Sequence, residues 1–280
     1  MRDDRKSLCL LLSVITACFS AFSTAHAGPG DLLVSPVRVV FEGRQRVAEV
    51  TLVNKSEQAA TYRLSVENRR MRRDGSFEVI EVPGDGDLFA EKYVRYAPRR
   101  VTLEPNAPQT IRLMARKPAD LKEGEYRSHL VFAAVPKEAG ANSIENQSGD
   151  ERDISIRLTP VYGVTIPMIV RHGSLSASAE IRDLQFTKDN ENNGAISFIL
   201  ARDGTKSIYG DISLHLAGEK APLIERRGIA VYVPNKERLI ELPVGQETLA
   251  QIKGRDVEVH FEERAAIGQP IVAEFTLALQ

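Results

Sequence analysis

Apolar and polar residues alternate along most of this chain with a period of two, the pattern of β-strands with one buried face. The longest alternation lies in residues 153–173. Six apolar residues within it occupy even positions: Ile154, Ile156, Leu158, Tyr162, Val164 and Ile166. The segment is longer than the usual strand of about five or six residues. We therefore expect one long strand that either bridges two substructures or offers its apolar row to another molecule.

Shorter alternating segments, separated by turn residues, fill the chain before the long strand. The predicted strands there are 37–41, 48–52, 62–66, 77–82, 111–115 and 125–135. Asp74-Gly75 favours a hairpin turn. Residues 96–103 contain Pro98 and are expected to be irregular, and the polar residues 137–152 are expected to form a mobile loop.

The same pattern resumes after Gly173 with a new set of strands. They are predicted at 181–186, 196–200, 212–216, 228–233, 238–242, 257–261 and 271–279, with one short helical turn at 246–252. About seven short strands in each half indicate an all-β fold of two β-sandwiches. We place the first domain at residues 28–170 and the second at residues 171–280.

Residues 1–27 resemble a secretory signal peptide. A basic start and an apolar run over residues 8–22 precede Ala25-His26-Ala27, which suits cleavage after Ala27. The alternative is a lipoprotein signal with Cys18 as the lipidated residue. Either signal predicts export of the mature chain.

The composition of the mature chain excludes several classes of function. Removing residues 1–27 from 280 leaves 253, and both cysteines, Cys9 and Cys18, leave with the signal. Taking three basic residues from 37 and two acidic residues from 38 leaves a formal net charge of −2. This balance gives no reason to expect nucleic acid as a partner. No second apolar run approaches the length of a membrane span, so no membrane insertion is expected.

Several motifs in the first half, in the same order, resemble periplasmic pilus (fimbrial) assembly chaperones. They are LVSPVRVVFEG at 33–43, VTLVN at 50–54, PRRVTLEP at 98–105, QTIRL at 109–113, EGEYRS at 123–128 and IPMIVR at 166–171. Beyond Gly173 the resemblance lies only in the number and length of strands.

The resemblance implies two immunoglobulin-like domains arranged as a boomerang, acting in the chaperone–usher pathway. Such chaperones lend a strand to pilin-type subunits that lack their last strand, then deliver them to an outer-membrane usher. The lent strand pairs exposed backbone groups and fills apolar pockets. The candidate donor residues here are Ile154, Ile156, Leu158, Tyr162 and Val164. An ordinary last strand of the first domain is the simpler alternative.

Arg38 matches the family's arginine that binds the carboxylate at the end of the subunit. A guanidinium fork suits this role because it donates two parallel hydrogen bonds. The family's partner lysine is absent, since Pro167 stands at the matching position. Thr165 and Arg157 are alternatives for this role, and the departure indicates a divergent branch.

Glu125 and Arg171 match the family's interdomain ion pair. The resemblance also implies a third acidic member from the second domain, with Glu262 and Glu263 as candidates. If Arg171 and Glu125 formed only a surface pair, they would contribute about 0–1 kcal/mol. A buried pair at the domain junction would matter more.

No pattern in the sequence indicates catalysis. His129, His172, His215 and His260 lack metal-ligand spacing, and no nucleophile elbow, P-loop or dinucleotide fingerprint is present. We expect no enzyme activity and no cofactor. The alternative function is a secreted two-domain β-sandwich that serves as a surface or adhesion component, and a periplasmic hydrolase is a distant third.

Overall fold

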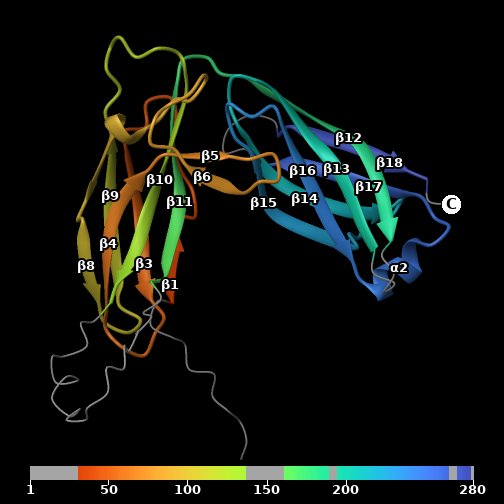
Figure 1. The fold of residues 1–280 in the computed structure, drawn as a ribbon, viewed down its shortest axis with the longest axis horizontal. Helices are drawn as coiled ribbons and strands as arrows, with labels where there is room; N and C mark the ends of the chain where they lie inside the picture. The colour runs from red at the N-terminus through yellow and green to blue at the C-terminus, as the bar shows by residue number, and fades with distance from the viewer. Residues whose placement is uncertain (1–30, 137–160, 189–193, 265–269, 279–280) are drawn as a thin grey trace, which may run out of the picture.

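The computed structural model describes residues 31–136, 161–188, 194–264 and 270–278, which form two β-sandwiches set at an angle to each other (Figure 1). A small hairpin of two strands lies between them. The predicted all-β fold of two β-sandwich domains is confirmed. The signal peptide and the loop at 137–152 lie outside the described residues, and the residue at which the domains divide stays a prediction.

Domain one, the first sandwich, is built from two facing sheets. One sheet has the order β1 (Leu32–Ser35), β3 (Val47–Asn54), β9 (Pro108–Ala115) and β7 (Val94–Ala97). The other has the order β2 (Val39–Phe41), β11 (Gly163–His172), β10 (Gly124–Val135), β4 (Ala60–Glu67) and β8 (Arg100–Leu103). The chain changes sheet between β1 and β2, and β2 pairs in parallel with β11.

Domain two, the second sandwich, has sheets of three and four strands. The smaller has the order β12 (Ala177–Lys188), β13 (Gly194–Gly204) and β16 (Glu237–Val244). The larger has the order β15 (Ile224–Val231), β14 (Ile208–Leu216), β17 (Val257–Glu263) and β18 (Val272–Leu277). The predicted helical turn is confirmed as α2 (Gln246–Ile252).

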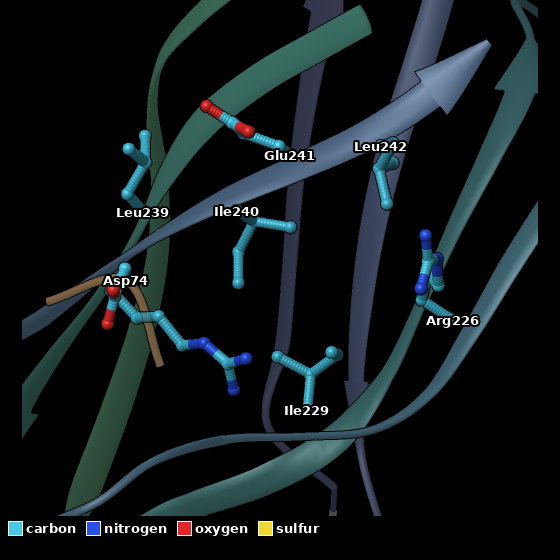
Figure 2. A pocket seen from close by; sticks show the side chains of 8 residues that line it. Asp74, Arg226, Ile229, Leu239, Ile240, Glu241 and Leu242 are labelled. Carbon is cyan, nitrogen blue, oxygen red and sulfur yellow. The ribbon is translucent and has the colours of Figure 1, made fainter. Parts of the chain in front are cut away.

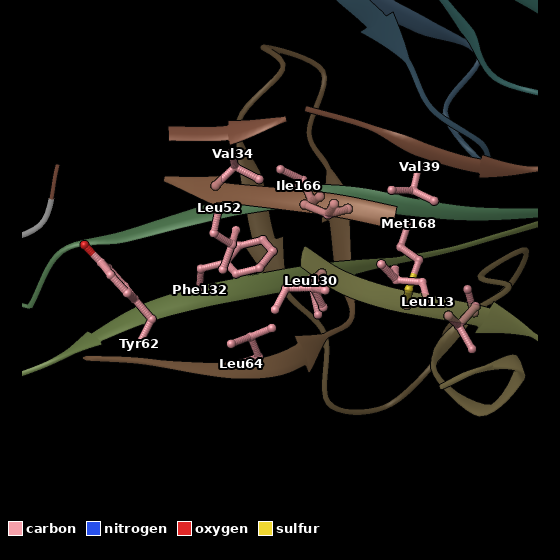
Figure 3. Packing of buried hydrophobic residues seen from close by; sticks show 14 of the residues in the cluster. Val34, Val39, Leu52, Tyr62, Leu64, Leu113, Leu130, Phe132, Ile166 and Met168 are labelled. Atoms are coloured by element: carbon pink, nitrogen blue, oxygen red, sulfur yellow. The ribbon is translucent and has the colours of Figure 1, made fainter. Parts of the chain in front are cut away.

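Each sandwich encloses its own apolar core. In domain one, Val34 and Leu52 from one sheet face Phe132 and Ile166 from the other (Figure 3). Strand β9 contributes one face to this core, because its last five residues alternate between buried and exposed. Burying each large aliphatic side chain contributes about 1.5–3 kcal/mol.

The predicted hairpin at Asp74-Gly75 is confirmed and forms a separate two-stranded sheet. Its strands are β5 (Arg69–Met71) and β6 (Phe77–Val79), which are paired antiparallel. Gly75 has a positive φ of 87°, a conformation that favours glycine. The hairpin extends from domain one toward domain two (Figure 1).

The expectation of irregular structure at residues 96–103 is wrong. The segment contains the end of β7 and all of β8, which belong to different sheets and flank Pro98. Each strand is only four residues long, so neither carries enough alternation to be recognised. A short 3-10 turn, η2 (Glu91–Tyr93), precedes β7.

Candidate functional site

Strand β10 is buried on both of its faces along residues 124–132, and this marks the junction of the two domains. Its even-numbered residues Tyr126, Leu130 and Phe132 belong to the core of domain one. Its odd-numbered residues Glu125 and Arg127 are also buried, although they point to the other side of the sheet. Charged side chains are seldom buried without partners. Their partners therefore define the junction.

Glu125 and Arg171 lie opposite each other on β10 and β11 and form an ion pair, with 2.9 Å between Arg171 Nε and Glu125 Oε2. The Glu125 side chain is completely buried. It also accepts hydrogen bonds from the backbone N–H of Ser207, at 3.0 Å, and from the Ser207 hydroxyl. Ser207 precedes β14 in domain two, so this carboxylate joins the two domains.

The third member of this cluster differs from the expected acid of domain two. In the described part of the chain, Arg171 pairs with Glu42 of domain one at 3.3 Å as well as with Glu125. Glu263 instead pairs with Lys206 at 3.7 Å. From domain two, the Ser207 carbonyl accepts a hydrogen bond from Arg171 Nη2 at 3.3 Å, so a backbone carbonyl stands where an acidic side chain was expected.

Arg127 is sandwiched between aromatic rings of the two domains. Its guanidinium carbon lies 4.4 Å from the ring centre of Tyr232 and 5.8 Å from that of Phe77. Such cation–π contacts gain strength when the pair is withdrawn from water. Burial lowers the pKa of Arg127 and raises the pKa of Tyr232. Tyr232 is therefore a neutral phenol at neutral pH, and Arg127 is a cation because a guanidinium is not deprotonated in proteins.

His129 lies beside Arg127 and stacks edge-on against Phe77, with ring centres 5.0 Å apart. Burial, followed by the charges of Arg127 and Arg69, lowers its pKa to about 3, so the ring is neutral at pH 7. Arg127 Nη1 lies 3.5 Å from His129 Nε2. Because arginine can only donate, Nε2 is the accepting nitrogen and the ring proton is on Nδ1. That donor has no partner among the described residues.

A cavity of about 280 Å³ opens beside His129, between the hairpin and domain two. The hairpin, β10, β11 and domain two all contribute to its wall. The lining residues are Arg69, Met71, Gly75, Phe77, His129, Thr165, Pro167, Gly228, Ala230, Tyr232 and Arg238. We call this space the cleft cavity. It combines aromatic and aliphatic surface with the donor groups of two arginines, a histidine and a threonine.

Arg38, the predicted carboxylate anchor, lies half-buried on the same junction. Its guanidinium carbon is 4.5 Å from the ring centre of Tyr209 and 5.8 Å from that of Tyr232. Its Nε has no acceptor in the described part of the chain. Arg38 and Arg127 therefore lie against the same ring, that of Tyr232. Sequence reasoning had not singled out Arg127.

The candidate donor residues are described only in part. Ile154, Ile156 and Leu158 lie outside the described residues. Tyr162 is 55% exposed, and Val164 packs at the edge of the core of domain one. Beyond them, Ile166 is fully inside this core. Going backward along the chain from Ile166 to Tyr162, the apolar row therefore leaves the core of domain one and becomes exposed.

The outer edge of β11 is open over residues 163–167. The Ala134 N–H donates to the Tyr162 carbonyl at 2.9 Å, so the even-numbered residues of β11 bond to β10 and the odd-numbered residues direct their backbone groups outward. Strand β2 covers this outer edge only beside residues 168–170. No other strand in the described ranges pairs with it. Pro167 lies on the outward-directed set, where its missing N–H breaks no bond to β10.

Within residues 31–136, 161–188, 194–264 and 270–278, no group of three or more His, Cys, Asp or Glu side chains could hold a metal ion. Among those same residues, no helix is long and apolar enough to cross a membrane.

Sequence reasoning did not assign five residues to the junction of the two domains: Arg127, His129, Ser207, Tyr232 and Arg238. One signal was available for two of them. The run EGEYRSH at 123–129 places charged and polar residues on both faces of a strand. A strand of this kind either is solvated or has a second protein surface against it. The sequence does not distinguish these cases.

Comparisons with solved structures give pilus chaperones, the class that the sequence motifs resemble. The YadV chaperone is 15% identical over 88% of this chain and 100% of its own, with a TM-score of 0.45. The E. coli chaperone DraB is 13% identical over 90% of this chain and 97% of its own, with a TM-score of 0.44. A chain of the chaperone–tip adhesion subunit complex from the archaic chaperone–usher Csu pili of Acinetobacter baumannii is 12% identical over 86% of this chain and 97% of its own, with a TM-score of 0.45.

No protein-family model matches the chain, and no curated protein matches it in sequence. Identities and TM-scores this low do not by themselves assign the chain to a family. The function proposed below is therefore supported by the chain's own residues.

Proposed function

We propose that this chain is a non-enzymatic periplasmic chaperone that binds pilin-type subunits by lending them a strand and passes them to an outer-membrane usher. The observation that carries the proposal is the open edge of β11, which is continuous with the apolar row of residues 154–166. An open edge with an apolar row is a template for strand addition. The residues that enter the subunit are Ile154, Ile156 and Leu158, while Val164 and Ile166 hold the strand in domain one.

The geometry of the open edge also supports the role of Arg38. Strand β2 runs parallel to β11 and begins at Val39, opposite Met168. A strand added along residues 163–167 in the same direction therefore ends beside Arg38. Its terminal carboxylate would meet a guanidinium, which suits a bidentate bond. Arg127 and Arg238 add positive charge to the same junction, so the missing lysine at Pro167 leaves no shortage of cations there.

Charge introduced into the apolar row tests the proposal. Ile156→Arg should abolish recovery of a soluble one-to-one complex when the chain is co-expressed with a pilin-type subunit that lacks its last strand. An arginine at this position would have to enter an apolar pocket. Ser155→Arg is the matched control, because it carries the same charge on the opposite face and should leave the complex intact. Normal binding by Ile156→Arg would reject the lent strand and leave the surface-component function.

The carboxylate anchor has its own test. Arg38→Ala should weaken subunit binding by about tenfold or more, because it removes a charge-assisted bond. Arg95→Ala, at an exposed position on β7, is the matched control and should bind as the wild type does. Unchanged affinity in Arg38→Ala would place the anchor elsewhere.

A further inference from the structure

The β5–β6 hairpin belongs to domain one in sequence but is bonded to domain two at its tip. The Leu239 N–H donates to the Arg73 carbonyl at 2.8 Å, and Asn235 Nδ2 donates to the Met71 carbonyl at 2.8 Å. Arg73 also pairs with Glu237 at 2.7 Å. These contacts all involve β16 or the turn that precedes it.

The base of the hairpin is tied to domain one by different contacts. Asn68, next to β5, accepts a hydrogen bond from the Ser128 hydroxyl at 2.6 Å and donates to Glu91 at 3.0 Å, and Arg70 forms a bidentate pair with Asp87. The base and the tip are therefore held by separate domains. A pocket of about 260 Å³ lies beside the tip, where Asp74 faces Leu239 and Ile240 of β16 (Figure 2). The tip is thus not tightly packed against domain two on this side.

The hairpin covers the cleft cavity and its donors. Met71 is buried against Ile169, Ala230 and Tyr232. Phe77 lies over His129 and Tyr232, with ring centres at 5.0 and 6.1 Å. The guanidinium of Arg238 presses on Gly75, where a Cβ atom would come within 2.2 Å of it. While the hairpin stays in place, Phe77 therefore covers one side of His129, Arg127 and Tyr232.

The contacts that close the hairpin are few and partly exposed. Met71 is its one buried apolar side chain, whereas Phe77 is 39% and Val79 60% exposed. The ion pair at the tip joins side chains that are 61% and 40% exposed, and such pairs contribute little. A two-stranded sheet by itself is only marginally stable. The hairpin therefore has the character of a local unit that opens without unfolding either sandwich.

We propose that the β5–β6 hairpin is a latch between the two domains, which releases from domain two to give access to the cleft cavity. Its closed form joins the domains, and its open form exposes Arg127, His129 and Tyr232. The latch itself is a property of the chain alone. That a bound subunit profits from the release rests on the function proposed above.

Thiol labelling measures the release without any partner. Residues 28–280 contain no cysteine, so Ala230→Cys in a chain of these residues places a single reporter under Met71. Ala273→Cys, buried in the core of domain two, reports its global unfolding. We expect the cysteine at 230 to react with an aromatic disulfide reagent much faster than the cysteine at 273. Adding Asn235→Ala should speed only the first reaction, by about fivefold, which corresponds to the loss of one hydrogen bond.

Equal labelling rates at both positions, or equal acceleration of both by Asn235→Ala, would overturn the latch. The hairpin would then open only when domain two unfolds. Circular dichroism of each cysteine variant verifies that it is folded, and Asn235→Asp, which cannot donate to the Met71 carbonyl, provides a second weakened latch in case Asn235→Ala distorts the turn.

A reversible crosslink tests whether the latch gates partner binding. The backbone bond between Arg73 and Leu239 holds these two segments at the spacing of paired strands, which is roughly 5 Å between Cα atoms. This spacing is within the range of a disulfide. Arg73→Cys with Leu239→Cys should bind the strand-deficient subunit when reduced and lose at least tenfold in affinity when oxidised. Equal binding in both forms would reject the gate. Absence of binding even by the reduced and wild-type forms would reject the proposed function instead.

Discussion

The two faces of β11 serve different parts of the molecule. Its even-numbered residues Ile166, Met168 and Val170 pack in the core of domain one. Its odd-numbered residues face the domain junction, where Ile169 packs against Tyr232 and Arg171 bonds to Glu125. One face is therefore determined by local alternation and the other by a surface far away in sequence. The difference shows that a strand can be read correctly from its pattern while half of its contacts remain unknown.

The two faces also differ in the forces that hold them. The even face gains from the burial of aliphatic surface, whose loss is graded with the volume removed. The odd face contains a buried charge, and removing its buried ionic partner leaves that charge uncompensated. A single substitution on the odd face should therefore cause a larger loss in the free energy of unfolding, and the expected losses can be ranked.

The largest effect is expected from Arg171→Ala. It leaves the fully buried carboxylate of Glu125 without its cation, and breaking a buried pair in this way costs about 3–5 kcal/mol. Urea unfolding followed by circular dichroism measures the loss. Glu42→Gln, which removes only the more exposed partner, should cost under about 1 kcal/mol. Similar losses in the two variants would show that the Glu125 pair is no stronger than a surface pair.

A smaller, pH-dependent effect is expected from His129, which lies opposite Pro167 on the odd face. Its pKa is about 3 in the folded state and near 6.5 when unfolded. Between these values the unfolded chain binds a proton that the folded chain does not, so stability falls as the pH falls from about 6.5 toward 3. His129→Gln should remove up to about 2 kcal/mol of the stability lost between pH 7 and pH 5.

Urea unfolding of wild type and His129→Gln at both pH values measures this difference. His172→Gln, a histidine substitution on the same sheet, is measured in parallel as the control. If His129→Gln lost stability with falling pH as steeply as the wild type, His129 would have to be accessible to protons in the folded state.

The smallest effect is expected from Pro167→Ala. The restored N–H points to the open outer edge, so the ladder to β10 gains no bond, and the added freedom of the unfolded chain lowers stability by about 0.4–1 kcal/mol. Hydrogen exchange of the alanine amide provides the second measurement. A strongly protected amide in the free protein would contradict the open edge at this position.

Much of the fold could be predicted from the sequence because most strands bury one face only. Alternation located β3, β9, β11 and the strands of domain two, and Asp74-Gly75 located the hairpin turn. The pattern failed for β7 and β8, which are too short to alternate convincingly. It also did not decide whether the second face of β10 is solvated or buried, since a polar outer face looks the same against water and against another domain.

The candidate site was only partly predictable for the same physical reason. Arg38, Glu125 and Arg171 were identified by resemblance, and the structure places all three at the junction. Arg127, His129 and Tyr232 acquire their significance from packing between domains, which no local spacing encodes. Ser207 shows the limit most clearly, because its backbone carbonyl, which no side-chain pattern reveals, accepts from Arg171 where an acidic side chain was expected. Their roles in binding stay predictions.

The bonds of Glu125 to both domains limit how freely the two sandwiches can be exchanged as modules. A chimera that kept domain one and took a different second domain would need a hydroxyl and a free backbone N–H at the place of Ser207. It would also need a small apolar residue and an aromatic ring at the places of Ala230 and Tyr232, to receive Ile169 and Arg127. Without them, a carboxylate and a guanidinium would be left in apolar surroundings with too few partners. The two domains are therefore matched to each other through the buried carboxylate of Glu125.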